Sequence, residues 1–142
     1  MVNIFTRTDK KEIVEAIRRA EKTTSGEIRV HVLSRLKGEP LDEAKRIFRK
    51  LGMHRTKEKN AVLILIAPEK RAFAIWGDEG IHAQVGETFW NAARDTMKSH
   101  FAAGRLKDGV LAGIESVEKK LAEHFPCRAG DTDELPDRVT GG

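Results

Sequence analysis

Two carboxylates stand between two glycines near the middle of the chain, in the run Gly77-Asp-Glu-Gly80. An apolar stretch ends just before this run, and a long amphipathic pattern begins a few residues after it. Glycine allows backbone conformations that other residues avoid, so Gly77 and Gly80 favour a tight turn at a strand end. Loops at strand ends are where α/β proteins place binding groups. Asp78 and Glu79 are therefore the first candidate site residues, although the same pattern is typical of a plain turn that caps a helix.

Calcium or magnesium would need more oxygen ligands than these two carboxylates supply. Asp108 is the candidate for a third ligand, because the junction of the last two helices could fold back towards the turn. Glu27 and Glu87 are further candidates. We predict a calcium or magnesium site with Asp78, Glu79 and Asp108 as ligands.

Other catalytic motifs are absent from the sequence. The five histidines show no zinc-ligand spacing, and a single cysteine gives no cysteine pair. Neither a Gly-x-Ser-x-Gly elbow nor a phosphate-binding glycine loop occurs. His82 is the one histidine beside the acidic turn, where it could act as an acid or base near neutral pH. The sequence does not support a covalent enzyme.

The composition indicates one well-solvated domain of 142 residues, with 39% hydrophobic and 34% charged residues. The longest apolar run, residues 61–67, is much shorter than the roughly 20 residues of a spanning helix. We expect no signal peptide, no membrane span and a cytoplasmic monomer; Cys127, as a single cysteine, cannot form an internal disulfide. The net charge of +4 comes from interleaved charges, so we expect no nucleic-acid partner.

Hydrophobic periodicity predicts the elements. They are a helix that starts at Asp9, a strand over 27–33, a helix over 41–51, strands over 61–67 and 72–76, a long helix closed by Gly104, and a helix over 106–125. Because helices and strands alternate, we predict an α/β fold, a three-layer α/β/α sandwich in which helices cover both faces of a small mixed sheet. Residues 1–126 form the domain, and residues 127–142 form a disordered polar tail.

Several stretches together resemble the TPM domain family, named for a thylakoid-lumen protein, a photosystem II repair protein and an acetylcholine-receptor modulator. They are Ser25-Gly-Glu-Ile-Arg-Val30, Asn60-Ala-Val-Leu-Ile-Leu-Ile-Ala67, Phe73-Ala-Ile-Trp-Gly-Asp-Glu-Gly-Ile-His82, Phe101–Gly104 and Asp108-Gly109. The resemblance covers about residues 9–125 and is closest to the bacterial branch with Gly-Asp-Glu-Gly-Ile-His. It implies an α/β/α sandwich with a shallow groove at the strand ends, which Gly77, Gly80, His82 and Arg105 would line in this sequence.

The resemblance also implies chemistry, since some members are reported as calcium-binding and plant relatives as acid phosphatases. Carried over to this sequence, the family's carboxylates are Asp78, Glu79 and Asp108. Many relatives have a signal peptide and a C-terminal membrane helix; this sequence shows neither pattern, so lumenal and membrane-bound roles do not transfer.

We therefore predict a divalent-cation-binding or protein-interaction module, with its groove at residues 77–82 and an unidentified protein as a possible partner. The alternative is a metal-assisted phosphomonoester hydrolase. In that enzyme the metal would polarise a phosphoryl oxygen and activate water, with Arg105 or His82 assisting.

Overall fold

The computed structural model describes residues 5–127 and 139–141 of the chain. Its elements are, in order, α1 (Arg7–Glu21), β1 (Glu27–Val32), α2 (Pro40–Lys50), the 3-10 helix η1 (Met53–Arg55), β2 (Ala61–Ala67), the 3-10 helix η2 (Pro68–Lys70), β3 (Ala72–Gly77), α3 (Glu79–Ala102), α4 (Leu106–His124) and β4 (Val139–Gly141). The predicted order of helices and strands is confirmed, and β4 is added to it.

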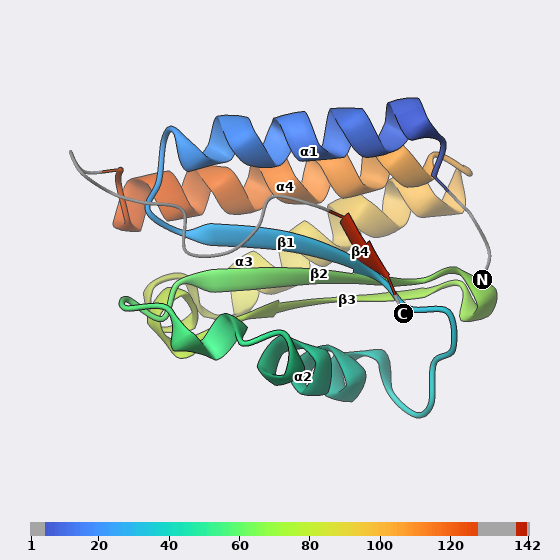
Figure 1. Ribbon diagram of the computed structural model, residues 1–142, viewed down its shortest axis with the longest axis horizontal. Coiled ribbons are helices and arrows are strands. Elements are labelled where there is room, and N and C mark those ends of the chain that lie inside the picture. The colour runs from blue at the N-terminus through green and yellow to red at the C-terminus, as the bar shows by residue number, and fades with distance from the viewer. Residues whose placement is uncertain (1–4, 128–138, 142) are drawn as a thin grey trace.

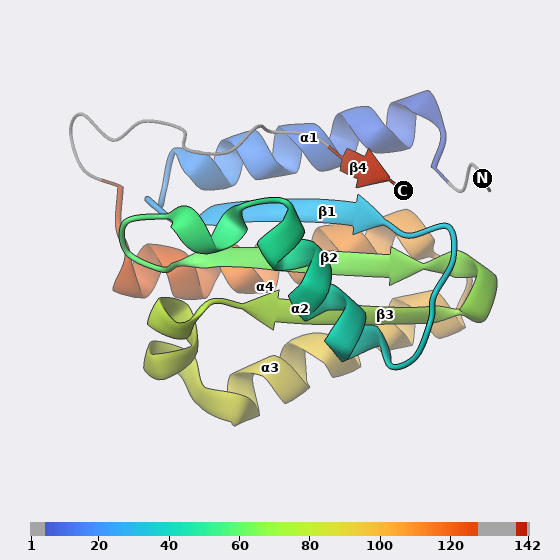
Figure 2. The same cartoon turned by 60° about the horizontal axis from the view of Figure 1, so that its bottom comes forward.

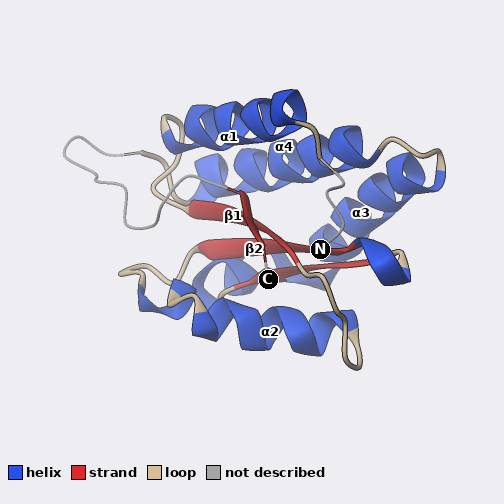
Figure 3. Ribbon diagram, turned by 45° about the vertical axis from the view of Figure 1, so that its right-hand side comes forward, coloured by secondary structure: helices blue, strands red, loops and turns tan. Residues whose placement is uncertain are grey.

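The elements form three layers (Figure 1), as the predicted α/β/α sandwich requires. Helices α1, α3 and α4 lie on one face of the sheet, and α2 lies across the other face (Figures 1 and 2). Figure 3 shows the sheet between these helical layers. No helix in the described part of the chain is long and apolar enough to cross a membrane.

The four-stranded sheet is mixed, with the order β3-β2-β1-β4. β1 runs parallel to both β2 and β4, whereas β3 runs antiparallel to β2 and pairs Gly77 with Val62. The antiparallel hairpin therefore returns the end of β3 to the start of β2. The acidic turn that follows Gly77 lies at the end of the sheet where strands β1 and β2 begin.

Strand β4 corrects the prediction of a disordered tail for residues 139–141. These residues pair in parallel with β1, Val139 beside Val30 and Thr140 beside His31. Thr140 also makes side-chain hydrogen bonds to β1, which polar composition alone does not reveal. The rest of the predicted tail beyond Cys127 lies outside the described residues.

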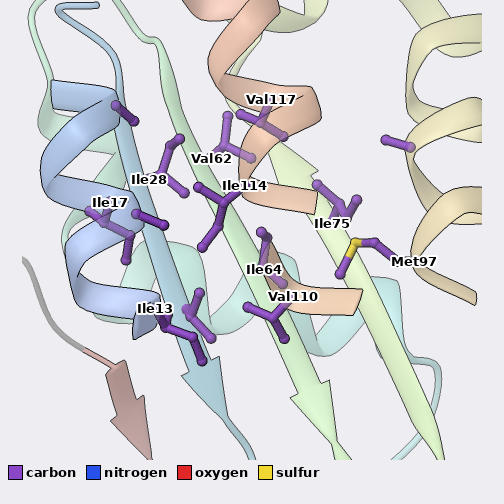
Figure 4. Close-up of a cluster of buried hydrophobic side chains, with 14 of the residues drawn as sticks. Ile13, Ile17, Ile28, Val62, Ile64, Ile75, Met97, Val110, Ile114 and Val117 are labelled. Carbon is purple, nitrogen blue, oxygen red and sulfur yellow. The ribbon is translucent and has the colours of Figure 1, made fainter. Parts of the chain in front are cut away.

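Each face of the sheet has its own hydrophobic core. The larger core joins α1, α3 and α4 to the sheet, with Ile114 of α4 packed between Val62 and Ile28 (Figure 4). The smaller core places α2 against side chains of β2 such as Leu63 and Leu65. β2 is buried along its whole length, as expected for a central strand covered on both faces.

Helix α1 begins slightly earlier than predicted. Thr6 is its N-cap: the Asp9 backbone N–H donates to the Thr6 hydroxyl, and the Thr6 N–H donates to the Asp9 carboxylate, both at 3.0 Å. Asp9 is therefore the third residue of helix α1 and the acidic member of a capping box, and not the residue at which the helix starts.

Candidate functional site

The acidic turn forms the start of helix α3. Asp78 is the N-cap, and its Oδ1 accepts a hydrogen bond of 2.9 Å from the Glu79 backbone N–H. The Asp78 N–H donates to the carbonyl of Ala61, and its own carbonyl accepts from the His82 N–H, each at 2.9 Å. The capping role weighed from the sequence is therefore present, and it accounts for one of the two Asp78 carboxylate oxygens.

The two glycines allow close packing at this turn. A Cβ on Gly80 would lie 2.2 Å from the Glu58 carbonyl oxygen and 2.5 Å from that of Lys59. A Cβ on Gly77 would lie 2.4 Å from the Trp90 ring. Only glycine lets the first turn of α3 press against the backbone that leads into β2.

Polar residues that precede β1 and β2 lie beside the acidic turn, at the same end of the sheet. The Ser25 hydroxyl donates to Glu58 Oε2 at 2.7 Å, and the Asn60 amide donates to the same oxygen at 3.2 Å and to Ser25 Oγ at 3.3 Å. Asn60 is only 2% exposed. We name this group the loop cluster; it comprises Ser25, His54, Thr56, Glu58, Asn60 and Gly77–Gly80.

Three buried polar atoms of the loop cluster have no hydrogen-bond partner among the described residues: Asp78 Oδ2, His54 Nδ1 and Thr56 Oγ1. Burial lowers the pKa of His54, as do the nearby cations Arg49, Arg55 and Lys59, while the Asp78 carboxylate acts to raise it. His54 and Asp78 thus lie within electrostatic range of each other. Buried polar atoms are normally satisfied, so each of these three atoms could accept a ligand or ordered water.

His82 is held by its neighbours. The Trp90 indole N–H donates to His82 Nδ1 at 3.0 Å, so a neutral His82 ring carries its proton on Nε2. That Nε2 lies 3.7 Å from a carboxylate oxygen of Glu87. Both contacts bridge the break in α3 at Gly86, whose φ is 73°. His82 therefore braces the start of α3.

The structure does not bring Asp108 or Arg105 to the acidic turn. Phe101, near the end of α3, packs on Phe73 near the start of β3, with ring centroids 4.8 Å apart. Gly109 lies against Phe101 as well. This end of the sheet is separated from Gly77 by four residues of β3, roughly 13 Å.

The predicted three-carboxylate arrangement is therefore not formed. Asp108 instead lies 3.8 Å from the ammonium of Lys107, which also pairs with Glu12 at 2.9 Å. The Arg105 Nε donates to His100 Nδ1 at 3.3 Å. Within residues 5–127 and 139–141, no group of three or more His, Cys, Asp or Glu side chains is placed to hold a metal ion.

Ser25 and Asn60 were recognised from the sequence only as part of the family resemblance, without a role in the site. Glu58, His54 and Thr56 were not predicted as site residues. A usable signal was present, because Ser25 and Asn60 each stand one or two residues before a predicted strand. Two strands that run parallel in one sheet bring such positions together.

These features define a small α/β/α domain with a mixed four-stranded sheet and a polar cluster where its two central parallel strands begin. The chain belongs to the TPM domain family, whose family model matches residues 1–120. A search of the curated proteins found no match.

Solved structures agree with this assignment. The chain is 42% identical to the BA42 protein of the psychrophilic bacterium Bizionia argentinensis, with a TM-score of 0.91 over 97% of this chain and 95% of that one. The N-terminal domain of the cg2496 protein from Corynebacterium glutamicum is 20% identical, with a TM-score of 0.67 over 92% of this chain and 81% of that one. The N-terminal domain of a P. gingivalis protein is 21% identical, with a TM-score of 0.68 over 89% and 83%. The latter two show the shared fold alone.

Proposed function

We propose that this TPM domain is a binding module and that its loop cluster takes a divalent cation, calcium or magnesium, through Asp78 and Glu79. The supporting observation is the second Asp78 oxygen, Oδ2, which is buried and has no hydrogen-bond partner among the described residues. Burying a carboxylate oxygen away from water costs free energy when no hydrogen-bond donor replaces the water. A bound cation would offset that cost. Glu79 follows directly in sequence and is exposed.

The donor set fits a weak site. Calcium and magnesium prefer oxygen ligands, and a site with few protein carboxylates completes its shell with water. The Thr56 hydroxyl is a further buried oxygen without a partner among the described residues. The ammonium of Lys59 and the guanidinium of Arg55 lie near enough to His54 to lower its pKa. Their positive charges therefore also weaken the binding of a cation in the loop cluster. We expect a dissociation constant of about 1 mM, at the weak end of calcium sites.

The geometry favours binding over phosphomonoester hydrolysis. Of the two residues predicted to assist, Arg105 lies at the far end of β3, and His82 Nδ1 already accepts the Trp90 indole hydrogen. Arg105 therefore lies too far from Asp78 to assist there, and Nδ1 of His82 is not free to act as a general base in this arrangement.

A cation titration followed by backbone amide NMR tests the proposal. Calcium or magnesium at up to about 10 mM should shift the amides of Gly77–Gly80 in the wild-type chain, roughly ten times the expected dissociation constant. Asp78→Asn keeps a side chain that can cap α3 but removes the charge, so these shifts should disappear without unfolding.

Asp108→Asn is the matched control, because it removes the same charge at the other end of the sheet. Its titration should equal that of the wild type. Shifts that survive Asp78→Asn, or that vanish equally in Asp108→Asn, would rule out the site. A measurement of p-nitrophenyl phosphate hydrolysis on the same samples tests the enzymatic alternative, which requires turnover lost in Asp78→Asn.

A further inference from the structure

The edge of β1 away from β2 is covered by a very short strand. β4 has three residues, which pair in parallel with Val30, His31 and Val32. The β1 residues are buried, whereas Val139 and Thr140 are half-buried and Gly141 is exposed. An edge strand presents main-chain N–H and C=O groups that can pair with any extended chain. The part of this cover that the structure describes is three residues long, and it pairs with the edge through few main-chain hydrogen bonds.

Thr140 makes the most specific contact of β4. Its hydroxyl donates to the Val30 carbonyl at 3.2 Å, and its oxygen lies 2.7 Å from His31 Nδ1. A hydroxyl has a single hydrogen, which the carbonyl uses here, so the imidazole Nδ1–H must be the donor to Thr140. The position opposite His31 thus requires one group that both accepts from an imidazole and donates to a carbonyl. The hydroxyls of serine and threonine meet both requirements with a single atom.

His31 is a fixed part of this edge rather than a surface side chain. It is 6% exposed. Burial, followed by the charges of Arg29 on β1 and of Lys50 and Arg46 on α2, lowers its pKa to about 4. The ring is therefore neutral at physiological pH, with its proton on Nδ1, ready to donate to a hydroxyl on an added strand.

We propose that the β1 edge is a strand-addition site for an extended segment of another protein that carries serine or threonine opposite His31, and that β4 is its internal, displaceable occupant. Main-chain pairing with β1 supplies the affinity in this mode of recognition, and the hydroxyl supplies the selectivity. The neighbouring position of the added strand takes a β-branched residue, because Val139 packs against the larger core from there. This site lies along the second half of β1, away from the loop cluster.

A foreign segment fits better than a second copy of this chain. The tail of a second copy offers the same three residues, and it must compete with an identical tail held at high effective concentration in the same molecule. Pro136 stands three residues before Val139 in the sequence, and proline has no N–H to donate to a strand ladder. A segment without such a proline can form a longer strand and so displace β4.

The test uses the full chain with Val139→Asp, which puts a charge at the apolar position of β4 and should release it. The probe is a fluorescent peptide with the sequence of residues 135–142, in three forms: unchanged, with the threonine replaced by valine, and with the proline replaced by valine. Fluorescence anisotropy gives the affinities, and amide NMR locates the binding. Thr140→Val in the full chain is a second, milder release variant in case Val139→Asp does not fold.

The unchanged peptide should bind the release variant at least about tenfold more tightly than it binds the wild type, and should shift the amides of Val30–Val32. The threonine-to-valine peptide should bind at least about tenfold more weakly, and the proline-to-valine peptide more tightly, than the unchanged form; tenfold corresponds to the loss of one good hydrogen bond. Equal affinity of the threonine and valine peptides, or shifts elsewhere, would overturn the proposal. A wild-type dimer in sedimentation would also overturn it, because exchange of β4 strands between two copies would produce that dimer.

Discussion

The buried imidazole of His31 should make the stability of this domain depend on pH in a defined window. Its pKa falls from 6.5 to about 4 through burial first and then through the charges of Arg29, Lys50 and Arg46. The folded protein therefore keeps the ring neutral while the unfolded chain protonates it below pH 6.5. Since the unfolded state then binds more protons, stability from this group is complete above about pH 6.5 and is lost progressively between pH 6.5 and 4.

The magnitude follows from the same pKa difference. A lowering by about 2.5 pKa units corresponds to roughly 3.4 kcal/mol at 1.36 kcal/mol per unit. Arg46 and Lys50 are exposed, so solvent and salt screen part of their effect. We expect about 2 kcal/mol of unfolding free energy to be lost through His31 between pH 7.5 and 4.5.

Urea denaturation of the wild type and of His31→Gln at both pH values measures this contribution. Carboxylates that titrate in the same range affect both proteins alike, so the difference between the two pH dependences isolates His31. The wild type should lose about 2 kcal/mol more than the variant. An NMR titration in which the His31 ring protonates with a midpoint near 6.5, or equal pH dependences for the two proteins, would refute the reasoning.

The remaining predictions concern packing and capping, and urea denaturation checks each of them. Gly80→Ala should cost about 1–3 kcal/mol because its Cβ meets the rigid Glu58 carbonyl, whereas Gly113→Ala should change stability by less than about 1 kcal/mol because its Cβ meets the flexible Met97 side chain; equal costs would contradict this contrast. Ile114→Ala should cost about 2–5 kcal/mol, since Ile114 is 2% exposed in the larger core, and a smaller loss would mean that the core collapses around the gap. Asp78→Ala should cost about 1 kcal/mol by removing the cap of α3, while Asp78→Asn should cost little; a similar loss in both would show that the charge, not the cap, stabilises the turn.

Periodicity was sufficient to predict the layers of this fold. The alternation of Ile28, Val30 and Val32 marks a strand with one apolar face, and the unbroken apolar run of β2 marks a strand covered on both faces. Both strands lie where they were predicted. β4 could not be predicted in this way, because three residues show no periodicity and its contacts depend on a hydroxyl reaching His31 across the sheet edge.

The candidate site was predicted only in part, and the reason is geometric. The antiparallel hairpin places Gly77 at the start of β2, and a helix of 24 residues, α3, then carries the chain to the other end of the sheet. Asp108 follows that helix, so it could meet Asp78 only if the chain turned back along α3. The observed hairpin and the long helix together exclude the predicted ligand set.

The loop cluster is better understood from the two oxygens of Asp78 than from the number of carboxylates. One oxygen caps α3 and so belongs to the fold, and the other is buried without a partner among the described residues. Both oxygens depend on Gly80 for their positions, because its missing Cβ lets the capped turn approach the Glu58 and Lys59 carbonyls. A substitution that moves this turn must therefore alter stability and any cation binding at once, whereas Asp78→Asn should separate them.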